Sequence, residues 1–110
     1  MAKTTSTANL VMHQGTDFSA TFDVFGDDGL PMNLLSHTAR AQMRPHYESN
    51  TAYPFSCVTF NGGITISMNA AVTSTITARR YVYDVELVAP DTLVSRPVRG
   101  LIKVVPEVSK

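Results

Sequence analysis

The sequence predicts an all-β domain, a single antiparallel β-sandwich of about seven short strands. Three observations favour this class. Apolar and polar residues alternate along several short runs, which places one face of each strand on a core and the other in water. Turn-forming residues separate these runs. The run over residues 81–105 is typical of one long antiparallel hairpin.

This C-terminal hairpin shows the alternation most clearly. Its first strand has one largely apolar face, made of Tyr81, Tyr83, Val85 and Leu87. Asp84 and Glu86 fall on the opposite face, which indicates a solvated or partner-facing surface. Residues 89–92 form the turn, and residues 93–105 form the second strand.

Four residues of the hairpin carry further expectations. Pro97 lacks an N–H group, so we expect it at a sheet edge or a bulge. Gly100 is expected at a bulge or bend. Tyr81 and Tyr83 stand near the start of the penultimate strand, where a tyrosine in a sandwich often hydrogen-bonds back to a nearby backbone. We therefore favour a structural role over ligand binding for both tyrosines.

The first half of the chain predicts three strands. Residues 9–13 form a short one. Residues 17–25 alternate, and the following Gly-Asp-Asp-Gly sequence at 26–29 is a strong turn signal. Residues 38–44 alternate again, until Pro45 ends the strand. The inward side chains expected from the two longer strands are Phe18, Ala20, Phe22, Val24, Ala39, Ala41 and Met43.

The middle of the chain predicts a loop, a hairpin and one helical turn. Residues 46–53 form the longest polar loop. Residues 55–60 and 64–68 are paired strands around a tight turn at 61–63. Residues 69–78 are the only segment where a helical turn is expected, with Asn69 as its cap. The threonines of this segment limit the helix to a turn or two.

The length and the N-terminus indicate one domain. The chain has 110 residues, enough for a single core. Residues 1–8 are polar and rich in threonine, so we expect a flexible arm before a sandwich domain at 9–110. The arm lacks the apolar core of a signal peptide, and no stretch approaches the ~20 apolar residues of a membrane helix. The sequence therefore predicts that the chain is made and kept in the cytoplasm, or assembled into a particle there, and that it has no membrane partner.

The charge balance argues against nucleic acid as a partner. Nine basic and nine acidic residues give a formal net charge of zero, whereas nucleic-acid binders normally present a basic face. Arg40 and Arg44 share a strand face, and further arginines stand at 79, 80, 96 and 99. Neutrality also weakens repulsion between copies and so permits self-association.

The residues give no pattern for catalysis, a metal or a cofactor. His13, His37 and His46 share no ligand spacing, and the turn at 26–29 lacks the ligands of a calcium loop. No serine lies in a nucleophile elbow, and no phosphate loop is present. Cys57, the single cysteine, excludes an intrachain disulfide and is expected to be a small buried hydrophobe. We predict a protein that is not an enzyme.

Six segments of the chain resemble small virion proteins of tailed phages, including the immunoglobulin-like N-terminal domain of baseplate upper proteins. They cover nearly the whole length and span residues 13–19, 28–34, 38–44, 63–68, 80–87 and 104–109. The resemblance implies an immunoglobulin-like β-sandwich, no catalysis and attachment to other virion proteins. Its motifs are turns and strand faces, so it implies no site residue. The chain departs from the family at Leu35-Ser36-His37 and at Pro97.

The function expected from this resemblance is structural. The chain would be a multi-copy or homo-oligomeric virion component that joins a tail, baseplate or neck, or decorates the capsid. We expect the loop 45–54, with Tyr47, Tyr53 and Phe55, to contact a partner, because tyrosine is favoured at interfaces. Arg40 and Arg44 are further candidate contacts. Two alternatives stay open: a carbohydrate- or peptide-binding module that uses Tyr47 and Tyr53, and an enzyme whose site is assembled by oligomerisation.

Overall fold

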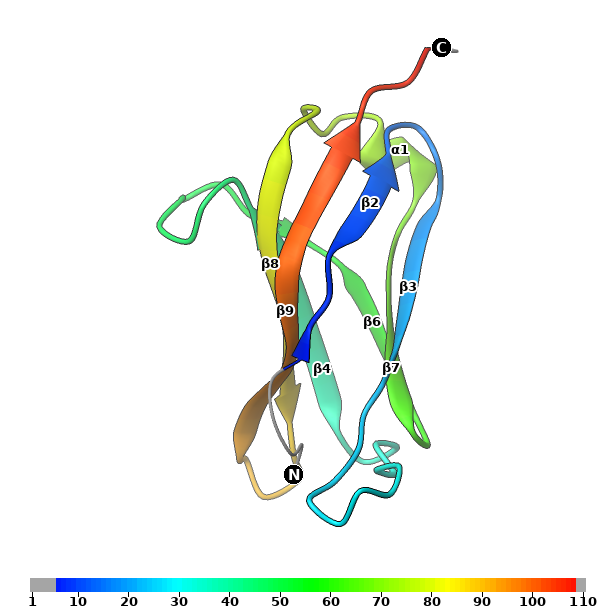
Figure 1. Cartoon of the computed structure of the whole chain (residues 1–110), viewed down its shortest axis with the longest axis vertical. Coiled ribbons are helices and arrows are strands. Elements are labelled where there is room, and N and C mark those ends of the chain that lie inside the picture. The colour runs from blue at the N-terminus through cyan, green and yellow to red at the C-terminus, as the bar shows by residue number, and fades with distance from the viewer. Residues whose placement is uncertain (1–5, 109–110) are drawn as a thin grey trace.

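Two β-sheets pack face to face in the computed structural model, which describes residues 6–108 (Figure 1). The larger sheet contains, in spatial order, β1 (Ser6–Thr7) and β2 (Leu10–His13) on one edge, then β9 (Val94–Val105), β8 (Arg80–Val88), β4 (Thr38–Arg44) and β5 (Tyr53–Pro54). The smaller sheet has the order β3 (Phe18–Asp23), β7 (Gly63–Met68) and β6 (Ser56–Phe60). One short helix, α1 (Ala70–Thr73), follows β7. The predicted all-β sandwich is confirmed.

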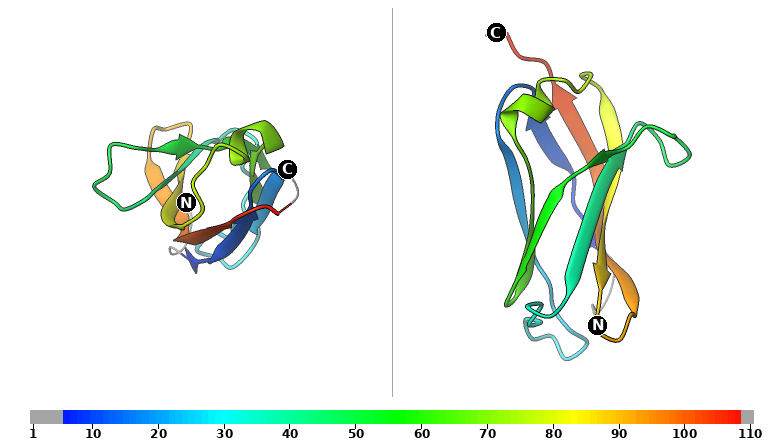
Figure 2. Two further views of the ribbon diagram at one scale, coloured as in Figure 1. Left: turned by 90° about the horizontal axis from the view of Figure 1, so that it is seen from above. Right: turned by 180° about the vertical axis from the view of Figure 1, so that it is seen from behind.

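The core lies between the sheets, as the alternation predicts. Side chains that alternate along β4 and β8 are buried, and their neighbours in sequence face outward. In the view down the long axis, the strands of the sandwich surround its interior (Figure 2). The completely buried side chains come from both sheets and from the segments beside them, and include Met12, Leu34, Met43, Ile64, Ile66, Val85 and Ile102.

The C-terminal hairpin forms the centre of the larger sheet. β8 and β9 pair antiparallel, from Arg80 opposite Lys103 to Val88 opposite Val94. Their register shifts between Val85 and Leu87, where β9 contains one extra residue. Pro97 lies in this bulge, where its missing N–H costs no ladder hydrogen bond. The expectation for Pro97 is confirmed.

The edge beyond β9 differs from the expected antiparallel arrangement. β1 and β2 both run parallel to β9. The Ala8 backbone crosses so close to Gly100 that a Cβ there would strike the Ala8 carbonyl. Gly100 pairs opposite Tyr83, away from the register shift, so the expected bulge is not at this position. Its missing side chain instead leaves room for the neighbouring strand.

Part of the expected flexible N-terminal arm belongs to the larger sheet. Ser6 and Thr7, expected to be flexible, form β1 opposite Val98 and Arg99. The Tyr83 hydroxyl donates a hydrogen bond to the Ala8 carbonyl at 2.6 Å, which ties this edge to the central strand. Residues 1–5 of the expected arm lie outside the described residues.

Polar side chains hold the end of the sandwich at which β2 turns into β3. The Gln14 amide donates to the Ile76 carbonyl at 2.6 Å and accepts from the Glu107 N–H at 3.2 Å. The buried Thr73 hydroxyl accepts from the Gly15 N–H at 3.1 Å. Asn69 caps α1, as predicted, by accepting from the Val72 N–H at 3.0 Å. These contacts assign structural roles to the polar residues of this turn.

Candidate functional site: the outer face of the larger sheet

The outer face of the larger sheet carries a group of charged side chains that form ion pairs with one another. Alternation points the polar residues of β4, β8 and β9 away from the core. The pairing then aligns them in rows across the sheet. Arg40 lies opposite Glu86, and Gln42, Asp84 and Arg99 share the next row. We call this surface the charged face.

Two guanidinium groups converge on one carboxylate in the charged face. Glu86 forms ion pairs with Arg40 and, at 3.1 Å, with Arg96. Arg96 also lies 3.4 Å from the Asp84 carboxylate. Because the two arginine side chains are more than half exposed, each pair stabilises the fold by no more than about 1 kcal/mol. The pairs mainly fix the directions of these side chains.

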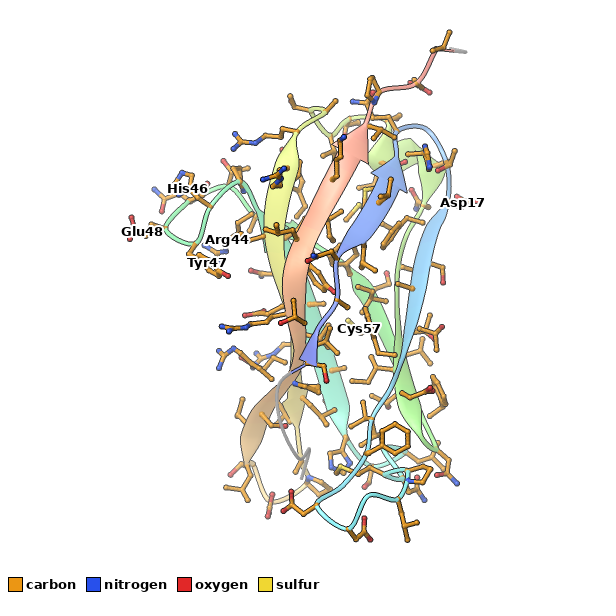
Figure 3. The ribbon with its side chains drawn as sticks, in the orientation of Figure 1. Asp17, Arg44, His46, Tyr47, Glu48 and Cys57 are labelled. Atoms are coloured by element: carbon orange, nitrogen blue, oxygen red, sulfur yellow. The ribbon has the colours of Figure 1, made fainter. Side chains whose placement is uncertain are left out.

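A shallow depression of about 390 Å³ lies on this face. Its lining includes Arg40, Gln42, Asp84 and Arg96, with Tyr47 from the adjacent loop. The loop projects away from the body of the sandwich and carries His46, Tyr47 and Glu48 (Figures 2 and 3). The depression is therefore open, polar and bordered on one side by an aromatic ring.

Arg44 links the loop to the sheet. Its guanidinium donates to the Ser49 carbonyl at 2.6 Å and to the Gln42 side-chain oxygen at 3.1 Å. A second tether within the loop is the hydrogen bond from the Ser49 N–H to the His46 carbonyl at 3.0 Å. Arg44 thus orients the segment that presents Tyr47, which is 69% exposed.

The five predicted contact residues do not form one surface. Arg40, Arg44 and Tyr47 meet at the depression. Tyr53 belongs to β5, opposite Met43, and its ring packs edge-on against Tyr81 at 5.9 Å between centroids.

Phe55, which the sequence predicted at a partner contact, does not lie on the surface. It is buried in the core, 5.9 Å from the Phe18 ring centroid, so it cannot contact a partner. The physical reason is that β5 directly precedes β6 and crosses toward the smaller sheet; the Phe55 N–H bonds to the Ala41 carbonyl at this crossing.

Three further residues of the site were identified in the sequence only as outward-facing or basic. Asp84 and Glu86 share an outward face by simple alternation, and Arg96 stands in the last strand. Their convergence with Arg40 depends on the β4–β8 register and on the bulge in β9, which aims Arg96 at both carboxylates. The alternation therefore predicted which side chains lie on the outer face, but it did not predict the ion pairs among them.

The tyrosines behind the face are structural. Burial raises the pKa of Tyr83 to about 12. Burial also raises the pKa of Tyr81, with a further increase from Tyr53 and an opposing effect of Arg79. The Tyr81 hydroxyl donates to the Thr77 carbonyl at 2.7 Å, four residues upstream. The expected hydrogen bond from a tyrosine hydroxyl to nearby backbone is confirmed.

The remaining candidate groups lie apart from one another. Cys57 is half-buried, and burial raises the pKa of its thiol against a smaller lowering effect of the Ala41 backbone. The buried Nδ1 atom of His37 has no hydrogen-bond partner among the described residues. Within residues 6–108, no cluster of His, Cys, Asp and Glu side chains is arranged to hold a metal ion. In the same range, no helix is long and apolar enough to cross a membrane.

Comparisons with known proteins add information on the fold. No family model and no curated protein sequence matches the chain. A crystal structure of a mutant of the SrpA adhesin from Streptococcus sanguinis is similar, with a TM-score of 0.51 and 13% sequence identity. The match covers 89% of this chain and 55% of the adhesin chain, so this chain spans little more than half of its length. At this identity the likeness shows a shared fold alone.

Proposed function

We propose that the chain is a non-catalytic structural protein of a tailed-phage virion: a tail, baseplate or neck adaptor, or a capsid-decorating component. It acts by protein–protein assembly, and the charged face is its docking surface. The motifs that resemble phage virion proteins supply the virion setting. The sandwich fold agrees with the fold that this resemblance implies.

The observation that carries the proposal is the construction of the charged face. A solvated sheet face needs only polar side chains, but this face holds a connected group of arginines and carboxylates beside a tethered loop with an exposed tyrosine. Arginine and tyrosine are enriched where proteins contact one another.

Particles of the phage that encodes the chain provide the test. We expect the chain in particles purified by density gradient, at a fixed ratio to the major structural proteins measured by quantitative mass spectrometry. Immunogold electron microscopy would then locate it on the tail, neck, baseplate or capsid. Its presence in infected cells together with its absence from purified particles would contradict the proposal.

Shortening the loop tests the docking surface separately. The cut should cover residues 46–51 only, because Tyr53 and Pro54 pair with β4. We expect the shortened chain to keep its far-ultraviolet circular dichroism and to lose most of its incorporation into particles. A matched control is Val58→Ser, which alters an exposed side chain on the smaller sheet. Equal incorporation of both variants would exclude the loop as a contact.

A carbohydrate- or peptide-binding module is the second candidate function. The depression favours it, because Tyr47 borders a polar hollow large enough for a small ligand group. A glycan and peptide array should then give saturable binding that Tyr47→Ala removes and Val58→Ser leaves unchanged. Binding that is insensitive to Tyr47→Ala would place the ligand elsewhere and remove the support for this candidate.

A further inference from the structure

The neutral chain has a strongly uneven charge distribution. Seven basic residues stand within residues 6–108, and six of them point outward from the larger sheet: Arg40, Arg44, Arg80, Arg96, Arg99 and Lys103. The same face holds two carboxylates, Asp84 and Glu86, so it has a formal excess of four positive charges. The zero net charge of the whole chain conceals this cationic surface.

Part of this positive charge has no counterpart within the described strands of the sheet. Arg80 lies directly opposite Lys103, and Val11 is the next residue in that row. Like charges that face each other across strands destabilise a sheet. Arg99 lies opposite Asp84, but that carboxylate already pairs with Arg96. Folding alone does not explain this arrangement, whereas an anionic partner would.

One end of the molecule has the opposite charge. Residues 24–37 and 89–93 form loops at the same end of the sandwich, because Thr38, which follows the first loop, pairs with Val88, which precedes the second (Figure 1). These loops hold Asp27, Asp28 and Asp91, and they contain no lysine or arginine. We call this surface the acidic end.

The acidic end also exposes large apolar side chains. Leu30 and Leu35 are 62% and 68% exposed. Phe25, Leu93 and Val94 are each about half exposed in or beside the same loops. Exposed apolar residues with polar residues around them mark interaction surfaces. The charged face offers apolar groups of its own, since Val82 and Leu101 are neighbours across β8 and β9.

We infer that the acidic end of one copy docks on the charged face of a second copy of this chain. The contact is heterologous, because two different surfaces of the same chain meet. Repetition of such a contact builds a ring if the rotation closes and a filament if it does not. The inference rests on the proposed function, since it names the partner of the charged face within the virion.

The size of the acidic end sets the strength of this contact. The molecule measures 46 × 27 × 20 Å, so its end presents a cross-section of about 540 Å². A stable interface buries about 800 Å² on each partner. The contact between two free copies should therefore be weak, with a dissociation constant in the micromolar to millimolar range. In a particle, the neighbours on both sides would add to it.

Sedimentation equilibrium of the full chain tests the inference over protein concentrations from about 10 µM to about 1 mM. At low salt we expect the average mass to rise above the 12.0 kDa of the monomer as concentration increases. Salt at about 0.5 M should reverse the rise, because screening at that strength is effective beyond about 4 Å.

Two variants separate the surfaces. Arg99→Gln/Lys103→Glu alters the charged face, and Lys103→Glu also places a carboxylate opposite Arg80. Asp27→Lys/Leu30→Ser alters the acidic end at two exposed positions. We expect each variant to stay monomeric alone. An equimolar mixture should form dimers and stop there, because only one intact face and one intact end remain. The control Ser19→Lys/Val58→Ser, on the smaller sheet, should associate like the original chain.

The outcomes distinguish this contact from others. A chain that stays monomeric at all concentrations, or variants that associate like the original, would overturn the inference. So would variants whose mixture does not dimerise, since that result indicates a symmetric contact. Tight binding of duplex DNA at physiological salt, lost in the face variant, would identify a nucleic acid as the partner instead. A monomeric chain that is still found in purified particles would leave the proposed function intact.

Discussion

The outer faces of the two sheets present different kinds of side chain to solvent. The smaller sheet presents Ser19, Thr21, Ser56 and Ser67 to solvent, with a hydrogen bond of 2.9 Å between Thr21 and Thr65. The larger sheet presents arginines, carboxylates and a depression. Short hydroxyl side chains are sufficient to solvate a sheet. The ion pairs of the larger sheet are therefore not needed merely to solvate it, which supports the proposed docking role of this face.

The strongest test concerns the core that both faces share. Phe55→Ala should lower the free energy of unfolding by about 3–5 kcal/mol, because it leaves a cavity against Phe18. Tyr47→Ala should change it by less than about 0.5 kcal/mol, because that side chain is exposed. Urea denaturation measures both. Similar effects of the two substitutions would contradict the separation of a core residue from a surface residue.

The next test concerns the edge of the larger sheet. Gly100→Ala should destabilise the protein by about 1–3 kcal/mol, because the added methyl group meets the Ala8 carbonyl. Hydrogen exchange should show faster exchange in residues 6–13, while β3, β6 and β7 of the smaller sheet keep their protection. Unchanged exchange in residues 6–13 would mean that β1 and β2 do not depend on this close approach.

A third test uses the pKa of Tyr83. The folded pKa of about 12 lies above the ordinary value of 10, so the folded state retains the proton more strongly. The resulting stability is fully present below pH 10 and is lost as pH rises toward 12. Tyr83→Phe should remove part of this alkaline loss and cost about 1 kcal/mol at neutral pH, because the bond to Ala8 disappears. Denaturation midpoints of the original chain and of Tyr83→Phe, measured from pH 8 to about 12, would show whether the substitution reduces the alkaline loss of stability.

The smallest expected effect compares the two faces directly. A double-mutant cycle on Arg40 and Glu86 should give a coupling of about 0.2–1 kcal/mol, reduced by salt. The matched cycle on Thr21 and Thr65 should give a similar energy that does not respond to salt. A coupling of several kcal/mol at the ion pair would mean that the charged face is needed for folding, which would weaken its assignment as a docking surface.

Much of the fold could be predicted from local pattern. The alternation along residues 38–44 and 81–88 is sufficient to place Ala41, Met43 and Val85 in the core, where they lie. Pro97 at a bulge and Asn69 at a helix start followed from their own chemistry. These predictions succeeded because a missing N–H or a capping side chain acts within a few residues.

Less of the candidate site could be predicted. The sequence selected Tyr47, Arg40 and Arg44, which do meet at the depression, and it also selected Tyr53 and Phe55, which do not. The positions of Tyr53 and Phe55 have one cause. The loop ends earlier than its polar composition suggests, and β5 then pairs with β4. No local feature of Tyr53-Pro54 indicates that pairing.

The sequence by itself determined which residues of the alternating strands face the core, where most of the turns fall, and that the class is all-β. These properties depend on period-two alternation and on turn chemistry, which operate over a few residues. Only the tertiary structure decided the parallel pairing of β1 and β2, the burial of Phe55 and the gathering of six cations on one face. These depend on which distant strands become neighbours. That choice is made by the packing of the whole core, so a formal charge of zero could conceal a cationic face and an acidic end.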